Sequence, residues 1–189
     1  MIRRELESFL AAVRFFTRLP VPAWVGHSTA GLQAAIRWFP AVGALIGSLA
    51  ALVYLLAAQV WPAQVALLLS MASSIYLTGA FHEDGLSDTA DGLGGGWDKQ
   101  RILDIMKDSR VGSYGVIAMV LALLGKFVLL SSLAPALVPW ALLAGHAVSR
   151  FCATTLLATM DYVRDDALSR AKPLATRLSG GNLFVALCF

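Results

Sequence analysis

The chain has 189 residues, of which 58% are hydrophobic and only 14% are charged, and its mean hydropathy is +0.70. This composition excludes an ordinary soluble globular domain and predicts a protein embedded in a lipid bilayer. The formal net charge of +3 gives no reason to expect a nucleic-acid partner, because the positions of the charges matter more than their sum. The predicted fold class is all-α, a polytopic transmembrane helix bundle that forms a single integral membrane domain over residues 1–189.

The N-terminal segment MIRRELESFLAAVRFFTRLP scatters charges among its apolar residues. A secretory signal peptide has an uninterrupted apolar core, so this segment is not expected to be one. The pattern instead predicts an N-terminal amphipathic helix that lies in the membrane interface.

Four apolar stretches are long enough to cross a hydrocarbon core, which requires roughly 20 residues of helix. Pro62 and Pro135 mark turns, so the four spans form two hairpins with very short outer connections. A fifth apolar segment starting at residue 182 is expected to be a span cut short, because the chain stops at Phe189. The segment GALIG, Gly43 to Gly47, is a small-xxx-small motif and predicts close helix packing. The predicted spans are residues 39–61, 62–81, 111–134 and 135–160.

Basic residues gather on one side of these spans. They precede the first span, lie between the second and the third, and follow the fourth, whereas the two outer turns carry none. By the positive-inside rule, the N-terminus, the loop after the second span and the segment after Met160 face the cytoplasm. The expected location is the cell inner membrane, with the active site on the cytoplasmic side.

The stretch FHEDGLSDTADGLGGGWD, residues 81–98, gathers five carboxylates in this otherwise apolar chain. If the second spanning helix continues past Phe81, then Asp84, Asp88 and Asp91 fall at i, i+4 and i+7 and share one face. An ordinary solvated loop would have no reason to place acids at helical spacing. We therefore interpret this face as functional.

A second acidic face follows the first. Helix is costly in the glycine run 92–96, which predicts a hinge. The segment WDKQRILDIMKDSR then predicts another helix, on which Asp104 and Asp108 are four residues apart. The result is a predicted cytoplasmic acidic helix-loop-helix, with Glu83 on the face next to the first row of acids.

Carboxylates placed this close repel one another, and a divalent cation between them supplies the missing counter-charge. All-oxygen ligation favours Mg²⁺, Mn²⁺ or Ca²⁺ over zinc or copper, and Mg²⁺ is usually held by a few carboxylates together with substrate phosphates. Lys107 and Arg110 lie among the acids and could hold the remaining phosphate oxygens. The sequence therefore predicts a metal-diphosphate site at the membrane surface, with Mg²⁺ as the cofactor.

Three ionisable residues lie inside predicted spans, where charge is costly. Arg150 is close enough to the cytoplasmic end of its helix to reach an anionic substrate group, with an ion pair or snorkelling as the alternative. Lys126 and His146 are expected to be structural. His82, at a helix end, is a candidate substrate contact or a structural hydrogen bonder. The segment DYVRDDALSRAKPLATRLSGG is expected to be a loop over the site or a plain connector.

HEDGLSDTADGLGGGWD followed by RILDIMKDSRVGSYG closely resembles the signature of the cobalamin synthase family, the membrane-bound adenosylcobinamide-GDP ribazoletransferases. The likeness extends from FFTRLPVP through FPAVGALIG to YVRDDALSRA and so covers almost the whole chain. It implies transfer of adenosylcobinamide phosphate from adenosylcobinamide-GDP to a ribose hydroxyl of α-ribazole or α-ribazole 5'-phosphate. GMP is released, with Mg²⁺ present, and the product is cobalamin or cobalamin 5'-phosphate.

The resemblance also implies roles for individual residues. Asp88 and Asp108 are the candidate catalytic residues, with Asp108 as the general base. Substrate phosphates are assigned to Lys107, Arg110 and Arg150, and His82 is a further substrate contact. The candidate metal ligands are Asp84, Asp88, Asp91 and Asp108, supported by Glu83 and Asp104.

Two other functions fit the same acids. A CDP-alcohol phosphotransferase-like enzyme also uses acidic helix ends and Mg²⁺, although that family has Ala-Arg where this chain has Gly-Gly. A divalent-cation transporter could use the acids as a loading site, but transport sites usually lie near the membrane midplane. Besides the substrates, the lipid bilayer is the expected partner, and the sequence leaves room for an oligomer.

Overall fold

The computed structural model describes residues 2–161, 163 and 180–188 and is helical throughout the elements it contains. The all-α prediction is therefore confirmed. The segment 161–181, predicted as a loop over the site or a connector, lies mostly outside the described residues. In chain order the elements are α1 (Ile2–Phe16), α2 (Thr29–Ala35), the 3₁₀ helix η1 (Ile36–Trp38), α3 (Phe39–Ala57), α4 (Ala63–Thr78), α5 (Phe81–Gly95), α6 (Lys99–Ile105), α7 (Ser113–Ser131), α8 (Val138–Thr159) and α9 (Gly180–Leu187).

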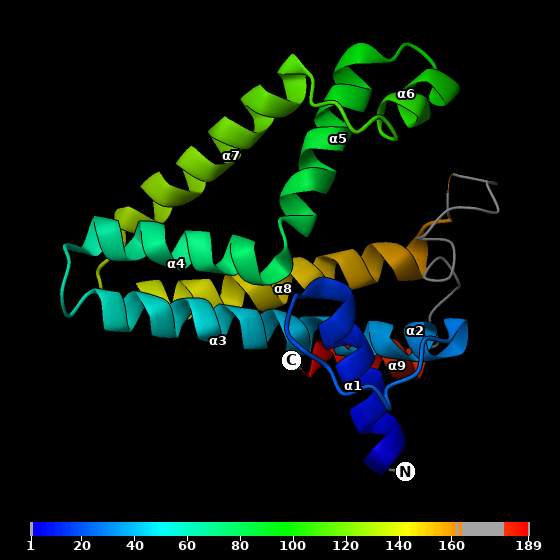
Figure 1. The fold of residues 1–189 in the computed structure, drawn as a ribbon, viewed down its shortest axis with the longest axis horizontal. Coiled ribbons are helices and arrows are strands. Elements are labelled where there is room, and N and C mark those ends of the chain that lie inside the picture. Colours follow the sequence, from blue (N-terminus) through cyan, green and yellow to red (C-terminus); the bar gives the residue numbers. More distant parts are fainter. Residues whose placement is uncertain (1, 162, 164–179, 189) are drawn as a thin grey trace.

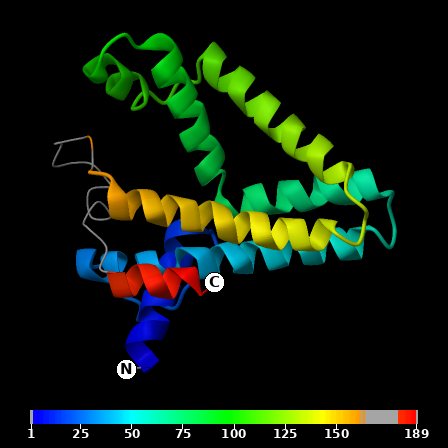
Figure 2. The same ribbon diagram turned by 180° about the vertical axis from the view of Figure 1, so that it is seen from behind.

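Three helices, α3, α4 and α8, lie side by side and form the body of the molecule (Figures 1 and 2). By length and apolar composition, three described helical segments could cross a membrane, namely Thr29–Ala57, α7 and α8. The bent pair of α4 and α5 raises that number to four if it counts as one span. Pro62 caps the start of α4, as its predicted place in a turn requires.

Helix α3 is the centre of this body and packs against both α4 and α8. The predicted packing motif lies at its contact with α8. A Cβ added at Gly43 would collide with the carbonyl oxygen of His146, and one at Gly47 would lie 2.7 Å from the Cα atom of Leu143. Two bare glycines therefore let the backbones of α3 and α8 approach closely, as small residues do in membrane helix pairs.

The second predicted span, residues 62–81, contains α4 but does not continue past Phe81 as one straight helix. Helix α4 ends at Thr78, and α5 begins at Phe81 after a bend of 85°. The bend is made by Gly79 and Ala80, which both have left-handed φ values, +66° and +58°. Helix α5 consequently leaves the bundle, and α4, α5 and α7 form three sides of a triangle (Figure 1).

The predicted glycine hinge is also displaced. Helix α5 continues through Gly95 and ends only at its cap, Gly96. Helix α6 then ends at Ile105, so Asp108 lies beyond it and does not share a helical face with Asp104. Tertiary packing overrides the low helix propensity of the glycines, because α5 packs against both α6 and α7.

Helix α1 is amphipathic, as predicted. Its apolar side chains, including Ala12, Val13 and Phe16, are buried against the start of α3 and its neighbours. Beyond its C-terminal end, the amide of Arg18 donates to the carbonyl of Leu77 over 2.8 Å. The end of α1 is therefore fixed beside the bend between α4 and α5. Helix α9 lies along α8 and the start of α3 (Figure 2).

Candidate functional site

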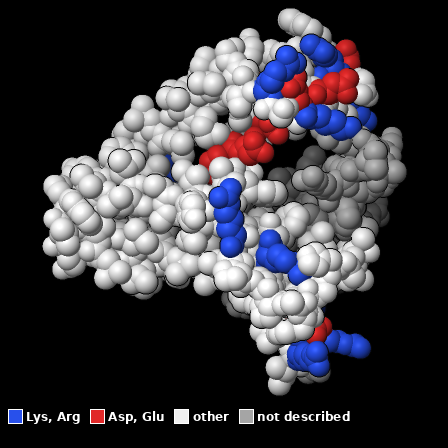
Figure 3. Space-filling model, in the orientation of Figure 1, with Lys and Arg blue, Asp and Glu red and all other residues white. Residues whose placement is uncertain are grey.

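Charged side chains gather over α5 and α6, whereas the wide face over α3, α4 and α7 is largely uncharged (Figure 3). Helix α7 in particular has one buried residue, Gly115, and exposes apolar side chains along its length. Such a surface suits the interior of a bilayer and not water. The candidate site is therefore built where the apolar bundle meets the charged α5–α6 pair.

Asp91 joins α5 to the beginning of α7. Its Oδ2 atom accepts a hydrogen bond from the amide of Gly112 over 2.7 Å, and its Oδ1 atom accepts one from the amide of Gly115 over 2.8 Å. Gly112 is the cap residue of α7, so the carboxylate satisfies amides that have no partner within that helix. A negative charge at a helix N-terminus is also favoured by the helix dipole. Asp91 is only 8% exposed, and its observed role is to fix α7 against α5.

We expect Asp91→Asn to lower the thermal stability of the protein. An Asn side chain accepts at one atom only, so its amide group would face a backbone N–H that needs an acceptor. The loss of one charge-assisted hydrogen bond corresponds to about 1.5–3 kcal/mol. The measurement is the melting temperature in detergent, with Asp84→Asn on the exposed side of the same helix as the matched control. An Asp91→Asn variant that melts like the parent would contradict this role.

The other acids of α5 point in two directions. Asp84 is exposed and Asp88 is half-buried, one helical turn apart. Glu83 turns away from them towards the bundle, where its Oε2 atom is buried without a hydrogen-bond partner among the described residues. The predicted shared face therefore consists of Asp84 and Asp88 at the surface and Asp91 at the α7 junction.

Asp108 is paired with Arg110. The guanidinium donates from Nε to both carboxylate oxygens over 3.1 Å and from Nη2 to Oδ2 over 2.6 Å. These side-chain hydrogen bonds, with a further one from the Arg110 amide, lower the pKa of Asp108 to about 2. Such an acid accepts a proton poorly at neutral pH while the pair is intact. The assignment of Asp108 as general base stays a prediction.

Two further candidates lie on or just after α6. Asp104 is exposed and accepts a hydrogen bond from Nε2 of Gln100 over 2.9 Å. Lys107 is exposed, in the turn that follows the helix. Among residues 2–161, 163 and 180–188, no three His, Cys, Asp or Glu side chains come close enough to hold one metal ion. Mg²⁺ is commonly held by one or two carboxylates plus substrate phosphates, so Asp84 and Asp88 still offer suitable chemistry.

Below the acidic surface lies a cavity of about 600 Å³ between α4, α5, α7 and α8. Arg150 lines it and is only 3% exposed, and its Nη1 atom donates to the carbonyl of His146 over 3.0 Å. The charged lining is completed by Glu83 and Lys126. The structure therefore brings together three predicted site residues, His82, Glu83 and Arg150. Two residues that the sequence interpretation treated as structural, Lys126 and His146, line the same cavity.

His82 joins this cavity to α1. Its ring stacks on Phe16 with ring centroids 5.5 Å apart, and the Arg150 guanidinium lies 5.5 Å from the centroid of the same phenyl ring. Phe16 therefore lies against two of the four predicted substrate contacts, His82 and Arg150. The sequence around Phe16 does not predict this position. The signal for Lys126 was available, because a lysine inside an apolar span usually faces a polar interior.

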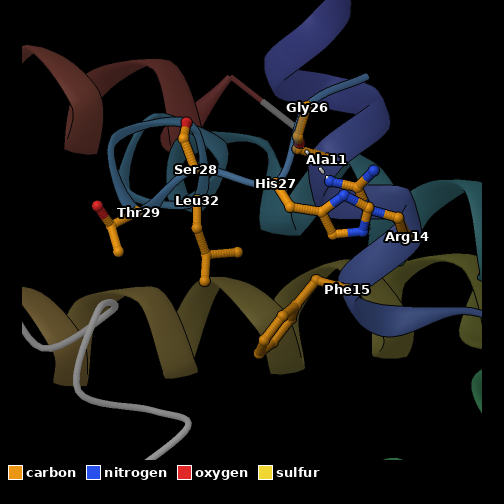
Figure 4. A pocket seen from close by; sticks show the side chains of 8 residues that line it. All are labelled: Ala11, Arg14, Phe15, Gly26, His27, Ser28, Thr29 and Leu32. Carbon is orange, nitrogen blue, oxygen red and sulfur yellow. Dashed lines mark hydrogen bonds between the residues drawn. The ribbon is translucent and has the colours of Figure 1, made fainter. Parts of the chain in front are cut away.

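A second hollow, of about 440 Å³, lies between α1 and α2 (Figure 4). Arg14 and His27 line it. The Arg14 guanidinium donates to the carbonyls of Val25 and Gly26 over 2.7 and 2.6 Å. These hydrogen bonds hold the loop between α1 and α2 against α1. None of the described residues that line this hollow is an acid, and we assign it a structural role.

Comparison with known proteins identifies relatives over nearly the whole chain. An adenosylcobinamide-GDP ribazoletransferase of Shewanella amazonensis is 53% identical over 92% of this chain and 68% of its own length. Proteins of the same name from Vibrio cholerae and Leptothrix cholodnii are 48% and 50% identical, over 98% and 97% of this chain and 71% and 70% of their lengths. No solved structure matches the chain. The family model described as cobalamin-5-phosphate synthase matches residues 8–189, and the chain therefore belongs to that family.

Proposed function

We propose that this protein is an adenosylcobinamide-GDP ribazoletransferase. In the reaction, a ribose hydroxyl of α-ribazole or its 5'-phosphate attacks the phosphorus that carries the adenosylcobinamide moiety. A new phosphate ester forms at this phosphorus, the phosphoanhydride bond to the GMP moiety breaks, and GMP leaves. The observation that carries this proposal is an identity of about half to named transferases over nearly the whole chain.

We assign the exposed acids of α5 to Mg²⁺. Asp84 and Asp88 lie one turn apart near the membrane surface, and two carboxylates together with substrate phosphates make a common Mg²⁺ ligand set. When bound, the ion would neutralise charge on the diphosphate. Asp91 supports this site by fixing α7 beside α5, and Asp104 remains a candidate ligand on α6.

Asp108, Lys107 and Arg110 form the second part of the proposed site. Arg110 is 88% exposed at its side chain and can exchange its carboxylate partner for a substrate phosphate, which also accepts two parallel hydrogen bonds. Departure of Arg110 would raise the pKa of Asp108 towards its ordinary value. Asp108 could then accept the proton of the attacking hydroxyl, while Lys107 neutralises phosphate charge.

We place the protein in the bacterial inner membrane with α5 and α6 on the cytoplasmic side. The basic residues between α4 and α7 support this orientation by the positive-inside rule. The phosphate groups of the substrates are charged and hydrated, so the substrates can reach a site at the cytoplasmic surface directly from water.

The test is GMP release from adenosylcobinamide-GDP and α-ribazole 5'-phosphate by the purified protein in liposomes. We expect release with Mg²⁺ and its loss when EDTA removes the metal. Release of CMP from CDP-alcohol substrates, without GMP release, would favour the CDP-alcohol phosphotransferase alternative. Movement of Mg²⁺ across the liposome membrane without release of either nucleotide would favour a transporter.

A further inference from the structure

The cavity between α4, α5, α7 and α8 has an apolar part and a charged part. Leu130 near the end of α7 and Leu142 near the start of α8 belong to one apolar cluster and line the apolar part. Arg150, further along α8, and Glu83 of α5 also line the cavity. The volume of about 600 Å³ is typical of small-molecule sites. Its shape suits an amphiphilic ligand.

The charges of the cavity do not balance. Among the described residues that line it, two cations, Lys126 and Arg150, face one carboxylate, Glu83. No ion pair within 4 Å joins these residues to each other or to another described acid. An excess positive charge in an apolar bundle is unfavourable unless an anion accompanies it. The lining therefore favours binding of an anion.

The hydrogen-bonding groups indicate which anion fits. Arg150 can only donate, so its contact of 3.3 Å with Nδ1 of His146 makes Nδ1 the acceptor and places the imidazole proton on Nε2. That Nε2 atom and the Nε atom of Arg150 are buried without a partner among the described residues. Buried donors nearly always find acceptors. Together with the ammonium group of Lys126, these donors need more acceptor oxygen atoms than the two that a carboxylate supplies.

We propose that this cavity is a phosphate-binding site within the membrane bundle, in which Lys126 and Arg150 hold the phosphate oxygens. His146 donates a further hydrogen bond, and the buried carboxylate of Glu83 accepts from a hydroxyl beside the phosphate. The apolar part of the cavity receives the body of the ligand. Two ligands have this chemistry, namely a phosphorylated nucleoside such as α-ribazole 5'-phosphate and a phospholipid with a hydroxyl-bearing headgroup.

The choice of α-ribazole 5'-phosphate as a probe rests on the proposed function, but the experiment measures binding without turnover, so failure to bind is distinguishable from failure to release GMP. Purified protein in neutral detergent is titrated with α-ribazole 5'-phosphate and with α-ribazole, in the absence of adenosylcobinamide-GDP. In parallel, its melting temperature is recorded with phosphatidylglycerol and with phosphatidylcholine. We expect about a tenfold preference for the phosphorylated nucleoside if the nucleotide is the ligand. A larger stabilisation by phosphatidylglycerol identifies a lipid ligand instead.

Variants decide whether the preference arises in this cavity. We expect Lys126→Met to abolish it, and Lys99→Met, which removes an exposed lysine from α6, to retain it. Ala122→Trp tests the cavity without removing a charge, because the indole would fill space that Ala122 now lines. The proposal is overturned if the parent shows neither preference, or if the preference survives in both folded Lys126→Met and folded Ala122→Trp protein.

Discussion

Asp88→Asn is expected to reduce GMP release by at least about 10²- to 10³-fold, the cost of removing one group that stabilises charge in a reaction. Asp88 is half-buried on α5, one turn from the exposed Asp84, where the proposed Mg²⁺ and the diphosphate would meet. An amide retains the shape of the carboxylate but not its charge, so the metal would be held more weakly. The measurement is Mg²⁺-dependent release of GMP in liposomes at saturating substrate.

Two further variants make the Asp88 result specific. Asp88→Glu retains the carboxylate and should restore part of the activity, especially at raised Mg²⁺ concentration. Glu7→Gln removes an acid that is paired with Arg3 in the N-terminal half of α1 and should behave like the parent. If Asp88→Asn released GMP at the parental rate, the assignment of the metal to this face of α5 would be wrong.

The apolar parts of the fold could be predicted from the sequence because they depend on local properties. Hydropathy and length give the approximate positions of α3, α7 and α8, and Pro62 gives the start of α4. The GALIG motif likewise predicts a close helix contact, although not that α8 is the partner. Membrane helices must satisfy their own backbone hydrogen bonds, so their existence is strongly determined by composition.

The bend between α4 and α5 could not be predicted in the same way. Gly79 adopts a left-handed conformation readily, but Ala80 does so at a steric cost that only its tertiary surroundings offset. One such contact is the hydrogen bond from the Arg18 amide to Leu77, which joins segments almost 60 residues apart. Periodicity within one segment contains no information about such a contact.

The sequence names candidate site residues, but it does not show how the fold arranges them. Helical spacing placed Asp91 with Asp84 and Asp88, yet the structure uses Asp91 to cap α7, more than 20 residues later in the chain. The cavity was missed for the same reason. Lys126 and Arg150 come from two different helices, α7 and α8, and only the tertiary fold brings them to one cavity.

Gly43→Ala is expected to lower the melting temperature in detergent by several degrees. The added Cβ would collide with the carbonyl oxygen of His146, which is backbone and cannot rotate away, so α3 and α8 would have to separate. Overpacking of this kind costs about 1–3 kcal/mol, and each kcal/mol corresponds to roughly 2–4 °C in a chain of this size. Displacement of α8 would also shift Arg150, so GMP release should fall with stability.

Gly125→Ala is the matched control for this substitution. Gly125 lies in the middle of α7, and a Cβ added there meets no atom within 4 Å. Alanine is the better helix former by about 1 kcal/mol, so the control should melt at the parental temperature or slightly above it. Opposite effects of one methyl group at two helical glycines would show that α3–α8 contact, and not helix propensity, sets the requirement for glycine at residue 43. Equal melting temperatures for the two variants would contradict the close packing of α3 on α8.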